Sequence, residues 1–349
     1  MGVRDRLAKA LHRAGALDAV MKLRRAAPIP GTLSILTYHH IAEHDPRYPY
    51  DPGVADATPD QFRRQMELVA KLATPVTIAE VVRALDGEPL PKNPVMVTFD
   101  DGYKSCREVA LPILKEVGLP AVFFVATAFV GERLLYWWER LAVILNQAKR
   151  DHAIITYPMR LELAAKAPGT LQSLARIIKD TPGLDLARFL GDLERAFGVE
   201  WHAEDDRNHA HELVMTWDDV RALANAGMDV ESHSRRHRVL ATLDPKTLDD
   251  ELLGSRLELE HQLGRPVQAI AYPVGARISH IKPIRDAVEK AGYKVGFTNA
   301  SGAARIWPGA LGRVMPTDRF DVPRLSTDRE MGDAMFLAQI AVPQLAYIS

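Results

Sequence analysis

The sequence predicts an α/β fold in which a mainly parallel sheet forms one large domain. Short apolar segments rich in β-branched and aromatic residues, typical of buried strands, alternate with segments of helical spacing. Alternating strands and helices favour parallel pairing, because each helix carries the chain back to the start of the next strand. The 349 residues could form two average domains, but α/β barrels often use this length as one.

The segments predicted as strands are residues 33–41, 94–99, 120–127, 228–232, 267–272 and 294–298. The helices predicted between them are residues 61–73, 107–118, 248–264 and 281–292. The last three helices end at a glycine, which commonly closes a helix because it adopts a positive φ. This order of elements predicts a barrel-type domain over residues 31–349.

Residues from about 136 to 210 interrupt the alternation, because strand signals largely disappear there. Helical spacing is found at residues 137–149, 171–179 and 186–197. We interpret this region as a helical insertion packed beside the barrel, over its open end. Its final stretch, residues 202–211, contains several potential metal ligands but is expected to be a solvated loop.

Residues 1–30 are predicted as a basic amphipathic helix, with apolar residues every three or four positions and arginine or lysine between them. Such a helix can lie on an anionic membrane surface, although a helix docked on its own domain has the same pattern. The segment lacks the uninterrupted apolar core of a secretion signal, and no stretch reaches the ~18 apolar residues of a membrane span. We therefore expect a cytoplasmic protein, peripheral on the inner membrane.

The composition excludes several classes of protein. Hydrophobic residues make up 47% of the chain and charged residues 26%, which is ordinary for a globular protein. The net charge of −1 provides no positive field, so we expect no nucleic-acid partner. Cys106 is the only cysteine, which rules out an internal disulfide and a zinc site built on several thiolates.

Two adjacent acids follow the predicted strand at residues 94–99, since Asp100 and Asp101 precede Gly102. Asp-Gly is also a hairpin signal, but a helix rather than a second strand follows here. The acids should therefore lie at the carboxyl end of a buried parallel strand, where α/β folds place active sites. One carboxylate can bind a metal ion while the other accepts a proton.

A second motif follows the strand at residues 228–232, where His233 and His237 are four residues apart. This spacing predicts two imidazoles on one face of a helical turn, a common arrangement for metal ligands. Alone the motif is weak, because surface histidines have the same spacing. Together with Asp101 on the same predicted rim, it indicates a site for zinc or for cobalt, nickel or manganese.

Three segments, VTFDDG, ESHSRRH and AYPVG, resemble successive motifs of the polysaccharide deacetylase family, known as NodB homology or carbohydrate esterase family 4. The resemblance covers residues 33–302 without the insertion. It implies a distorted (β/α) barrel and an enzyme that removes N-acetyl groups from amino sugars. It also implies that Asp100 is the base and that Asp101, His233 and His237 bind the metal.

The third motif departs from the family pattern, because the arginine that usually orients the base is absent from AYPVG at residues 271–275. Arg324, in an apolar context, is a candidate to replace it, although a surface arginine is the more common explanation of such a residue. In the family, the backbone N–H after the proline helps to hold the oxyanion. The resemblance therefore implies an oxyanion and substrate-binding role for Tyr272, Pro273 and Val274.

The family commonly supplies its catalytic acid from a histidine near the carboxyl end, but no histidine follows residue 302. ILTYHH, at residues 35–40, resembles that motif moved to the front of the chain. This order is similar to that of the circularly permuted poly-N-acetylglucosamine deacetylases, which implies that His39 is the acid. His40, which should point to the opposite side of a regular strand, is the second choice. A neutral histidine buried at a strand end is the alternative for His39.

The expected substrate is an N-acetylated saccharide, either a polysaccharide or its lipid-linked precursor. A carbon–nitrogen hydrolase acting on a non-sugar amide or on peptidoglycan remains an alternative, as does a non-catalytic carbohydrate-binding protein. Trp137 and Trp138 could stack on a sugar ring, but we expect them to anchor a helix on the barrel.

Overall fold

The computed structural model describes residues 3–26, 32–45, 47–275, 277–278, 280–306 and 317–342. The candidate site residues all lie within these ranges. Residues 1–2 and 27–30, the ends of the predicted N-terminal helix, lie outside them.

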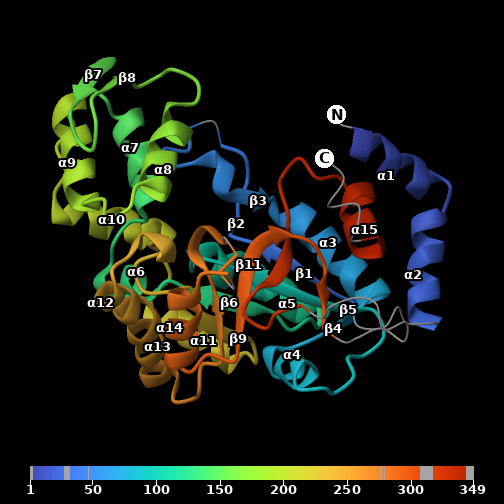
Figure 1. Ribbon diagram of the computed structural model, residues 1–349. Helices are drawn as coiled ribbons and strands as arrows, with labels where there is room; N and C mark the ends of the chain where they lie inside the picture. Colours follow the sequence, from blue (N-terminus) through green and yellow to red (C-terminus); the bar gives the residue numbers. More distant parts are fainter. Residues whose placement is uncertain are drawn as a thin grey trace.

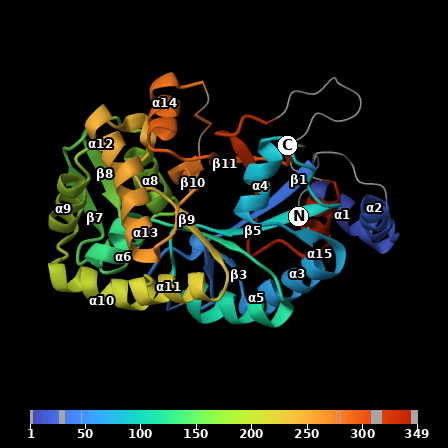
Figure 2. The ribbon, with the colours of Figure 1, turned by 90° about the horizontal axis from the view of Figure 1, so that it is seen from below.

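Among the described residues, seven parallel strands close into a barrel (Figures 1 and 2). They are β1 (Thr32–Tyr38), β5 (Pro94–Phe99), β6 (Val122–Val125), β9 (Asp229–Ser232), β10 (Ala269–Ala271), β11 (Val295–Ser301) and β13 (Val322–Ser326). Each pairs in parallel with the next in this order, and β13 pairs with β1 to complete the ring. The fold class predicted from the sequence is thereby confirmed.

Four further strands extend or flank the barrel. β4 (Thr74–Pro75) pairs with β5, and β12 (Ala304–Arg305) pairs antiparallel with β1. β2 (His40–Ile41) and β3 (Ala55–Ala57) form a small separate sheet. The predicted strand at residues 33–41 is therefore interrupted at His39, which begins the carboxyl rim of the barrel.

Side chains alternate between the inside and the outside of the barrel, as the two-residue period of a strand requires. Alternate positions such as Ile35, Met96, Phe124 and Val322 form one packed cluster that includes residues of opposite strands. The intervening positions, such as Phe99, pack in a larger cluster with the surrounding helices. This alternation decides which residues at the carboxyl ends can reach the mouth of the barrel.

The barrel helices are α3 (Pro59–Leu72), α4 (Ile78–Leu85), α5 (Leu111–Val117), α11 (Trp217–Asn225), α12 (Pro245–Asp249), α13 (Ser255–Leu263) and α14 (Lys282–Lys290). Each lies on the chain between two consecutive barrel strands, so the chain repeatedly returns to the same end of the barrel. Thr216 and Asp219 form a capping box at the start of α11. Gly118 and Gly264 end α5 and α13 in the left-handed conformation.

The region between β6 and α11 contains α6 (Thr127–Glu132), α7 (Trp137–Asn146), β7 (His152–Ile155), β8 (Leu161–Ala164), α8 (Thr170–Asp180), α9 (Leu186–Phe197) and α10 (Ala203–Leu213). It projects from one side of the barrel (Figure 1). The prediction of helices is correct for α7, α8 and α9, but the region also holds the antiparallel hairpin β7–β8. The sequence did not indicate β7 because this strand has only four residues and buries only every second one.

The expectation of a solvated loop at residues 202–211 is wrong, because most of this stretch belongs to α10. Asp205 accepts a hydrogen bond from the backbone N–H of His202, which starts the helix. Ala210 and Leu213 are buried, whereas most of the other side chains face solvent. The sequence did not indicate this amphipathic helix because the segment is mostly polar and the apolar side of the helix is narrow.

The N-terminal region forms two helices, α1 (Val3–Arg13) and α2 (Ala16–Ala26), rather than one. Gly15, at φ 68°, separates them. Both pack against α15 (Asp333–Ala341), on the side of the barrel opposite the insertion (Figures 1 and 2). Ala8, Leu17 and Met21 are buried in this contact region. None of the helices in the described ranges is long and apolar enough to cross a membrane.

Candidate active site

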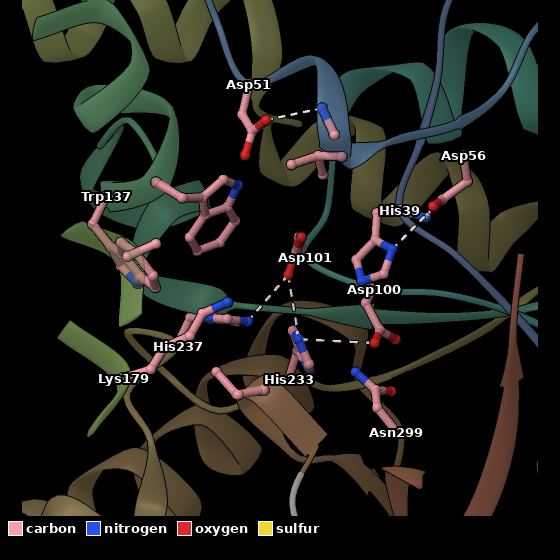
Figure 3. Close-up of a pocket in the computed structure, with 15 residues that line it drawn as sticks. His39, Asp51, Asp56, Asp100, Asp101, Trp137, Lys179, His233, His237 and Asn299 are labelled. Carbon is pink, nitrogen blue, oxygen red and sulfur yellow. Dashed lines mark hydrogen bonds and ion pairs between the residues drawn. The ribbon is translucent and has the colours of Figure 1, made fainter. Parts of the chain in front are cut away.

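A pocket of about 330 Å³ opens at the carboxyl rim of the barrel (Figure 3). The barrel and its rim loops contribute His39, Asp56, Asp100, Asp101, His233, His237, Val274 and Asn299. The insertion contributes Trp137, Trp138, Ala175 and Lys179, from α7 and α8. The remaining wall is the loop at Asp51, Gly53 and Val54. The insertion therefore forms one side of the pocket, as expected from its place over the open end.

Asp101, His233 and His237 converge at the centre of this pocket (Figure 3). Asp101 Oδ1 lies 3.2 Å from His233 Nε2 and 3.4 Å from His237 Nε2. One potential ligand atom from each residue lies within 4.8 Å of the other two. The histidines meet through a loop and not through the predicted helical turn, because Ser234 and His237 have positive φ angles of 61° and 51°.

The arrangement of these three residues suits a bound cation. His233 Nδ1 lies 2.9 Å from the carbonyl oxygen of Ala271 and donates its hydrogen there, so Nε2 is the ring atom available as a ligand. His233 Nε2 faces Asp101 Oδ1, a buried oxygen with no hydrogen-bond partner in the described structure. Burial lowers the pKa of His237 to about 3, so its imidazole is neutral and can act as a ligand. The three residues thus fit a divalent metal ion.

Asp100 and Arg324 form a buried, bidentate ion pair. Arg324 Nη1 donates to Asp100 Oδ1 at 2.7 Å, and Nη2 donates to Oδ2 at 2.6 Å. Both side chains are fully enclosed. Burial acts to raise the pKa of Asp100, but the charge and hydrogen bonds of Arg324 outweigh it and hold that pKa below its usual range. Asp100 is therefore ionised at neutral pH.

Arg324 reaches Asp100 because both side chains point into the barrel from β13 and from the end of β5, the two strands that flank β1. Asp100 follows Met96 and Thr98 in the inward register of β5, and Arg324 follows Val322 in that of β13. Asn299 Oδ1 accepts a further hydrogen bond of 2.6 Å from Arg324 Nη2. Arg324 thus contacts Asp100 as the sequence analysis suggested, and Asn299 is a lining residue that the sequence did not indicate.

His39 extends into the pocket beside Asp100 and Asp101 (Figure 3). Its Nδ1 lies 2.9 Å from Asp56 Oδ2, which also accepts a hydrogen bond from the His39 backbone N–H. Burial opposes the charging of His39, but the carboxylate of Asp56 outweighs it and raises the pKa of His39 to about 10. His39 is therefore an imidazolium at neutral pH, and not the neutral buried histidine of the alternative interpretation.

His40 points to the other side of the strand, as its position predicts. Its Nδ1 lies 2.8 Å from the hydroxyl of Ser105, away from the pocket lining. Burial and the charge of Arg329 lower the pKa of His40 to about 4, so it is neutral. His39 is consequently the histidine of this pair that the structure brings to the pocket.

Of the third motif, the structure brings only Val274 to the pocket lining. Tyr272 points outward from β10, where its hydroxyl donates to the carbonyl oxygen of Phe320 at 3.0 Å. Pro273 is buried and likewise absent from the lining. The structure therefore does not bring the side chains of Tyr272 and Pro273 to the pocket, because strand alternation turns Tyr272 out of the barrel.

The backbone at Val274 is strained, with φ 61° and ψ −15°. Positive φ is a marked outlier for a β-branched residue and persists only where surrounding structure enforces it. Gly275, at φ 69°, lets the chain pass close to Asn299, since a Cβ here would lie 2.4 Å from the Asn299 backbone nitrogen. The turn after β10 is thus held in one unusual conformation at the edge of the pocket.

The insertion wall is held by a hydrogen-bonded chain that the sequence did not reveal. Trp138 Nε1 donates to the hydroxyl of Tyr103 at 2.7 Å, and Tyr103 donates to Glu139 Oε1 at 2.6 Å. Glu139 Oε2 accepts from the backbone N–H of Asp51 at 2.7 Å. Burial raises the pKa of Glu139 to about 8. Trp138 also packs against His237, with ring centroids 4.6 Å apart.

The fold and the site together define a hydrolase of the (β/α) barrel class with a candidate metal centre on its carboxyl rim. The chain belongs to the polysaccharide deacetylase family, whose model matches residues 87–171 and 194–296, and it is thus assigned as a deacetylase. The match is interrupted only at residues 172–193, within the insertion, and includes the rest of that region.

Individual relatives agree with this assignment. The chain is 31% identical over 287 residues to YxkH of Bacillus subtilis, which carries a provisional name as a polysaccharide deacetylase; the match covers 79% of this chain and 67% of YxkH. It is 30% identical over 113 residues to the poly-β-1,6-N-acetyl-D-glucosamine N-deacetylase of Escherichia coli K12, covering 28% of this chain and 17% of that protein.

Solved structures support the same fold. The Streptococcus pyogenes deacetylase PplD, in complex with acetate, superposes with a TM-score of 0.57 at 20% identity, covering 90% of this chain and all of that one. IcaB from Ammonifex degensii superposes with a TM-score of 0.53 at 18% identity, covering 89% of this chain and 97% of that one.

Proposed function

We propose that this protein is a metal-dependent hydrolase that removes N-acetyl groups from amino sugars of a polysaccharide or of its lipid-linked precursor, releasing acetate. The convergence of two imidazoles on the unpartnered oxygen of Asp101, beside ionised Asp100, is the observation that carries this proposal. The similarity to a poly-β-1,6-N-acetyl-D-glucosamine N-deacetylase supports N-acetylglucosamine as the sugar.

The donor set favours zinc among the possible ions. Two imidazoles and one carboxylate, with positions left open, form a common catalytic zinc site, although cobalt, nickel and manganese accept the same ligands. A bound ion would polarise the amide carbonyl and lower the pKa of water. His233 would ligate through Nε2, because its Nδ1 hydrogen is committed to Ala271.

The remaining residues fit the proton transfers of amide hydrolysis. Asp100 accepts a proton from the attacking water, and Arg324 keeps that carboxylate ionised and fixed in orientation. His39, an imidazolium stabilised by Asp56, donates its proton to the leaving nitrogen. The backbone N–H of Val274 stabilises the oxyanion, a role that suits the rigid turn in which it lies.

Membrane association remains part of the proposal. The apolar face of α1 and α2 is partly buried in the protein, whereas Arg6, Arg13 and Lys22 are exposed. We propose that these basic side chains bring the protein to the anionic cytoplasmic surface of the inner membrane. Co-sedimentation with anionic but not zwitterionic vesicles would support this; equal binding to both would contradict it.

Acetate release tests the enzymatic proposal. The protein is loaded with zinc or cobalt and incubated with N-acetylglucosamine oligomers and with lipid-linked N-acetylated sugars. We expect release by the parent and its loss in Asp100→Asn and His39→Ala, with metal content unchanged in both variants. If the metal-loaded parent releases no acetate from any acetylated sugar, the substrate is a different amide.

A further inference from the structure

A second cavity of about 360 Å³ adjoins the catalytic pocket. Trp137 lines both, so this residue lies at their boundary. The chain links the two spaces directly: His237 lines the catalytic pocket, and the next residue, Arg238, lines the second cavity. Consecutive Cα atoms are only about 3.8 Å apart. The two cavities are therefore neighbours that share the wall formed by Trp137 and the segment His237–Arg238.

The floor of this cavity is apolar. It is lined by Phe129, Leu134, Leu135, Leu184, Leu186 and Leu190. A saccharide presents hydroxyl groups that lose hydrogen bonds with water when they are covered by aliphatic side chains. A hydrocarbon chain has no such cost and gains by leaving water. The lining therefore suits a hydrocarbon group better than further sugar units.

The rim of the cavity carries charges, most of which are already compensated. Arg140 forms ion pairs with Glu194 and Asp206, and Arg236 pairs with Glu132 and Asp250. Another charged lining residue, Asp185, caps the start of α9 by accepting a hydrogen bond from the Arg188 backbone N–H. These groups hold the cavity wall together and add little net charge.

Arg238 is different, because it has no carboxylate at ion-pair distance within the described residues. Its Nη2 donates to the carbonyl oxygen of Leu184 at 3.0 Å. A guanidinium has five N–H donors, so Arg238 retains donors for an anion, and its planar geometry suits phosphate. Because Arg238 follows His237, such a phosphate would lie between the metal centre and the apolar floor.

We propose that the second cavity binds the hydrocarbon chain of a lipid-linked N-acetylated sugar and that Arg238 binds the phosphate joining chain to sugar. This inference rests on the proposed deacetylase function, because it places the acetamido group in the catalytic pocket. It selects the lipid-linked precursor over the finished polysaccharide as the substrate.

Binding of farnesyl phosphate, which carries no sugar, tests the site independently of turnover. Calorimetry on the zinc-loaded protein measures the affinity for farnesyl phosphate, for farnesol and for glycerol phosphate. Farnesol reports the contribution of the hydrocarbon chain, and glycerol phosphate reports that of the phosphate. Ala187→Trp adds bulk at an exposed position of α9 that lines the cavity, and Ser173→Trp adds the same bulk on exposed α8 outside both cavities. We expect binding of farnesyl phosphate to weaken about tenfold or more in Ala187→Trp and to be unchanged in Ser173→Trp.

Arg238 is tested with a conservative pair of variants. We expect Arg238→Gln to weaken the binding of farnesyl phosphate about tenfold but to leave that of farnesol unchanged, and Arg238→Lys to retain part of the affinity. The metal content of each variant verifies that neighbouring His237 is undisturbed. Equal binding of farnesyl phosphate by the parent, Ala187→Trp and Arg238→Gln would overturn the proposal.

Turnover separates this inference from the proposed function. We expect Ala187→Trp to lower kcat/KM for farnesyl-phosphate-linked N-acetylglucosamine about tenfold relative to kcat/KM for a soluble oligomer. Acetate release from the oligomer without farnesyl phosphate binding would overturn only the lipid site. Farnesyl phosphate binding that responds to both cavity variants, without acetate release from any sugar, would instead overturn the deacetylase function.

Discussion

The two walls of the catalytic pocket are built in different ways. On the barrel wall, the two groups proposed to transfer protons are each held by a charged partner: Asp100 by Arg324, and His39 by Asp56. On the insertion wall, Trp138 is held by a neutral hydrogen bond to Tyr103 and by packing against Trp137, and Lys179 makes no ion pair within the described structure.

This difference separates chemistry from substrate choice. The barrel wall fixes protonation states, on which proton transfer depends directly. The insertion wall provides tryptophan rings and the ammonium group of Lys179. These groups contribute to substrate binding but leave the ionisation of Asp100 and His39 largely unchanged. Substitutions on the barrel wall should therefore lower kcat, whereas those on the insertion wall should alter KM. The following predictions test that division, from the largest expected effect to the smallest.

Asp100→Asn should have the largest effect on the rate. Asparagine keeps the shape of the side chain but cannot accept the proton, so kcat should fall by a factor on the order of 10²–10⁴. Acetate release at saturating substrate measures this loss. Unchanged metal content is the control, and a kcat within a few-fold of the parent would show that another group is the base.

Arg324→Met should have the largest effect on stability. It leaves Asp100 buried without its partner, so the free energy of unfolding at pH 7 should fall by about 3–5 kcal/mol. A carboxyl with a depressed pKa stabilises the fold above its unfolded pKa and loses that contribution as pH falls through the folded pKa. At pH 4 the parent retains most of this contribution, but in the variant burial raises the pKa of Asp100, so protonation there relieves the unpaired charge and the deficit should be smaller than at pH 7.

Denaturant unfolding at pH 7 and pH 4 measures the effect of Arg324→Met. The double variant Asp100→Asn with Arg324→Met is the matched control, since it removes the buried charge as well. It should recover part of the lost stability. Equal losses in the single and double variants would show that packing of Arg324, and not its charge, stabilises the barrel.

Asp56→Asn should change the pH dependence of turnover. In the parent, protonated His39 is present below its pKa of about 10 and is lost as pH rises through that value. Without Asp56, His39 loses the largest effect that raises its pKa and only the weaker effects of Asp101 and Asp100 still oppose burial, so its pKa falls. The alkaline limb of the kcat profile should move to lower pH, with kcat at pH 9 reduced about tenfold. An unmoved alkaline limb would exclude His39 as the acid.

Lys179→Met should have the smallest effect. A partly exposed cation contributes modestly to binding, so KM for an N-acetylglucosamine oligomer should change by at most about fivefold, with kcat within twofold of the parent. Initial rates across a range of oligomer concentrations measure both constants. A large fall in kcat would contradict the prediction that the insertion wall contributes to substrate binding and not to the chemical step.

Much of the barrel could be predicted because its signals are local. Strand composition and helix spacing identify the ring, and acids or histidines after a strand mark its carboxyl rim. Strand alternation could also have indicated Arg324, which shares the inward register of Val322, and excluded Tyr272, which does not share that of Ala271. Those two assignments needed the register of each strand and not only its existence.

The remaining parts depend on tertiary contacts. Asp56 lies on the three-residue strand β3, too short for a clear sequence signal, and it meets His39 only because β2 and β3 pair. Lys179 reaches the pocket through the packing of the insertion, and no spacing in the sequence links it to Asp101. The strained turn at Val274 has no local signal either, since valine disfavours positive φ.

The position of Arg324 has a consequence for the order in which the protein can mature. Asp100 belongs to an early strand of the ring, but its counter-charge is supplied by β13, the last strand described. During synthesis from the amino terminus, the chain acquires its base long before it acquires the arginine. A nascent barrel therefore cannot enclose Asp100 in its ionised form until β13 has emerged, which couples closure of the ring to completion of the active site.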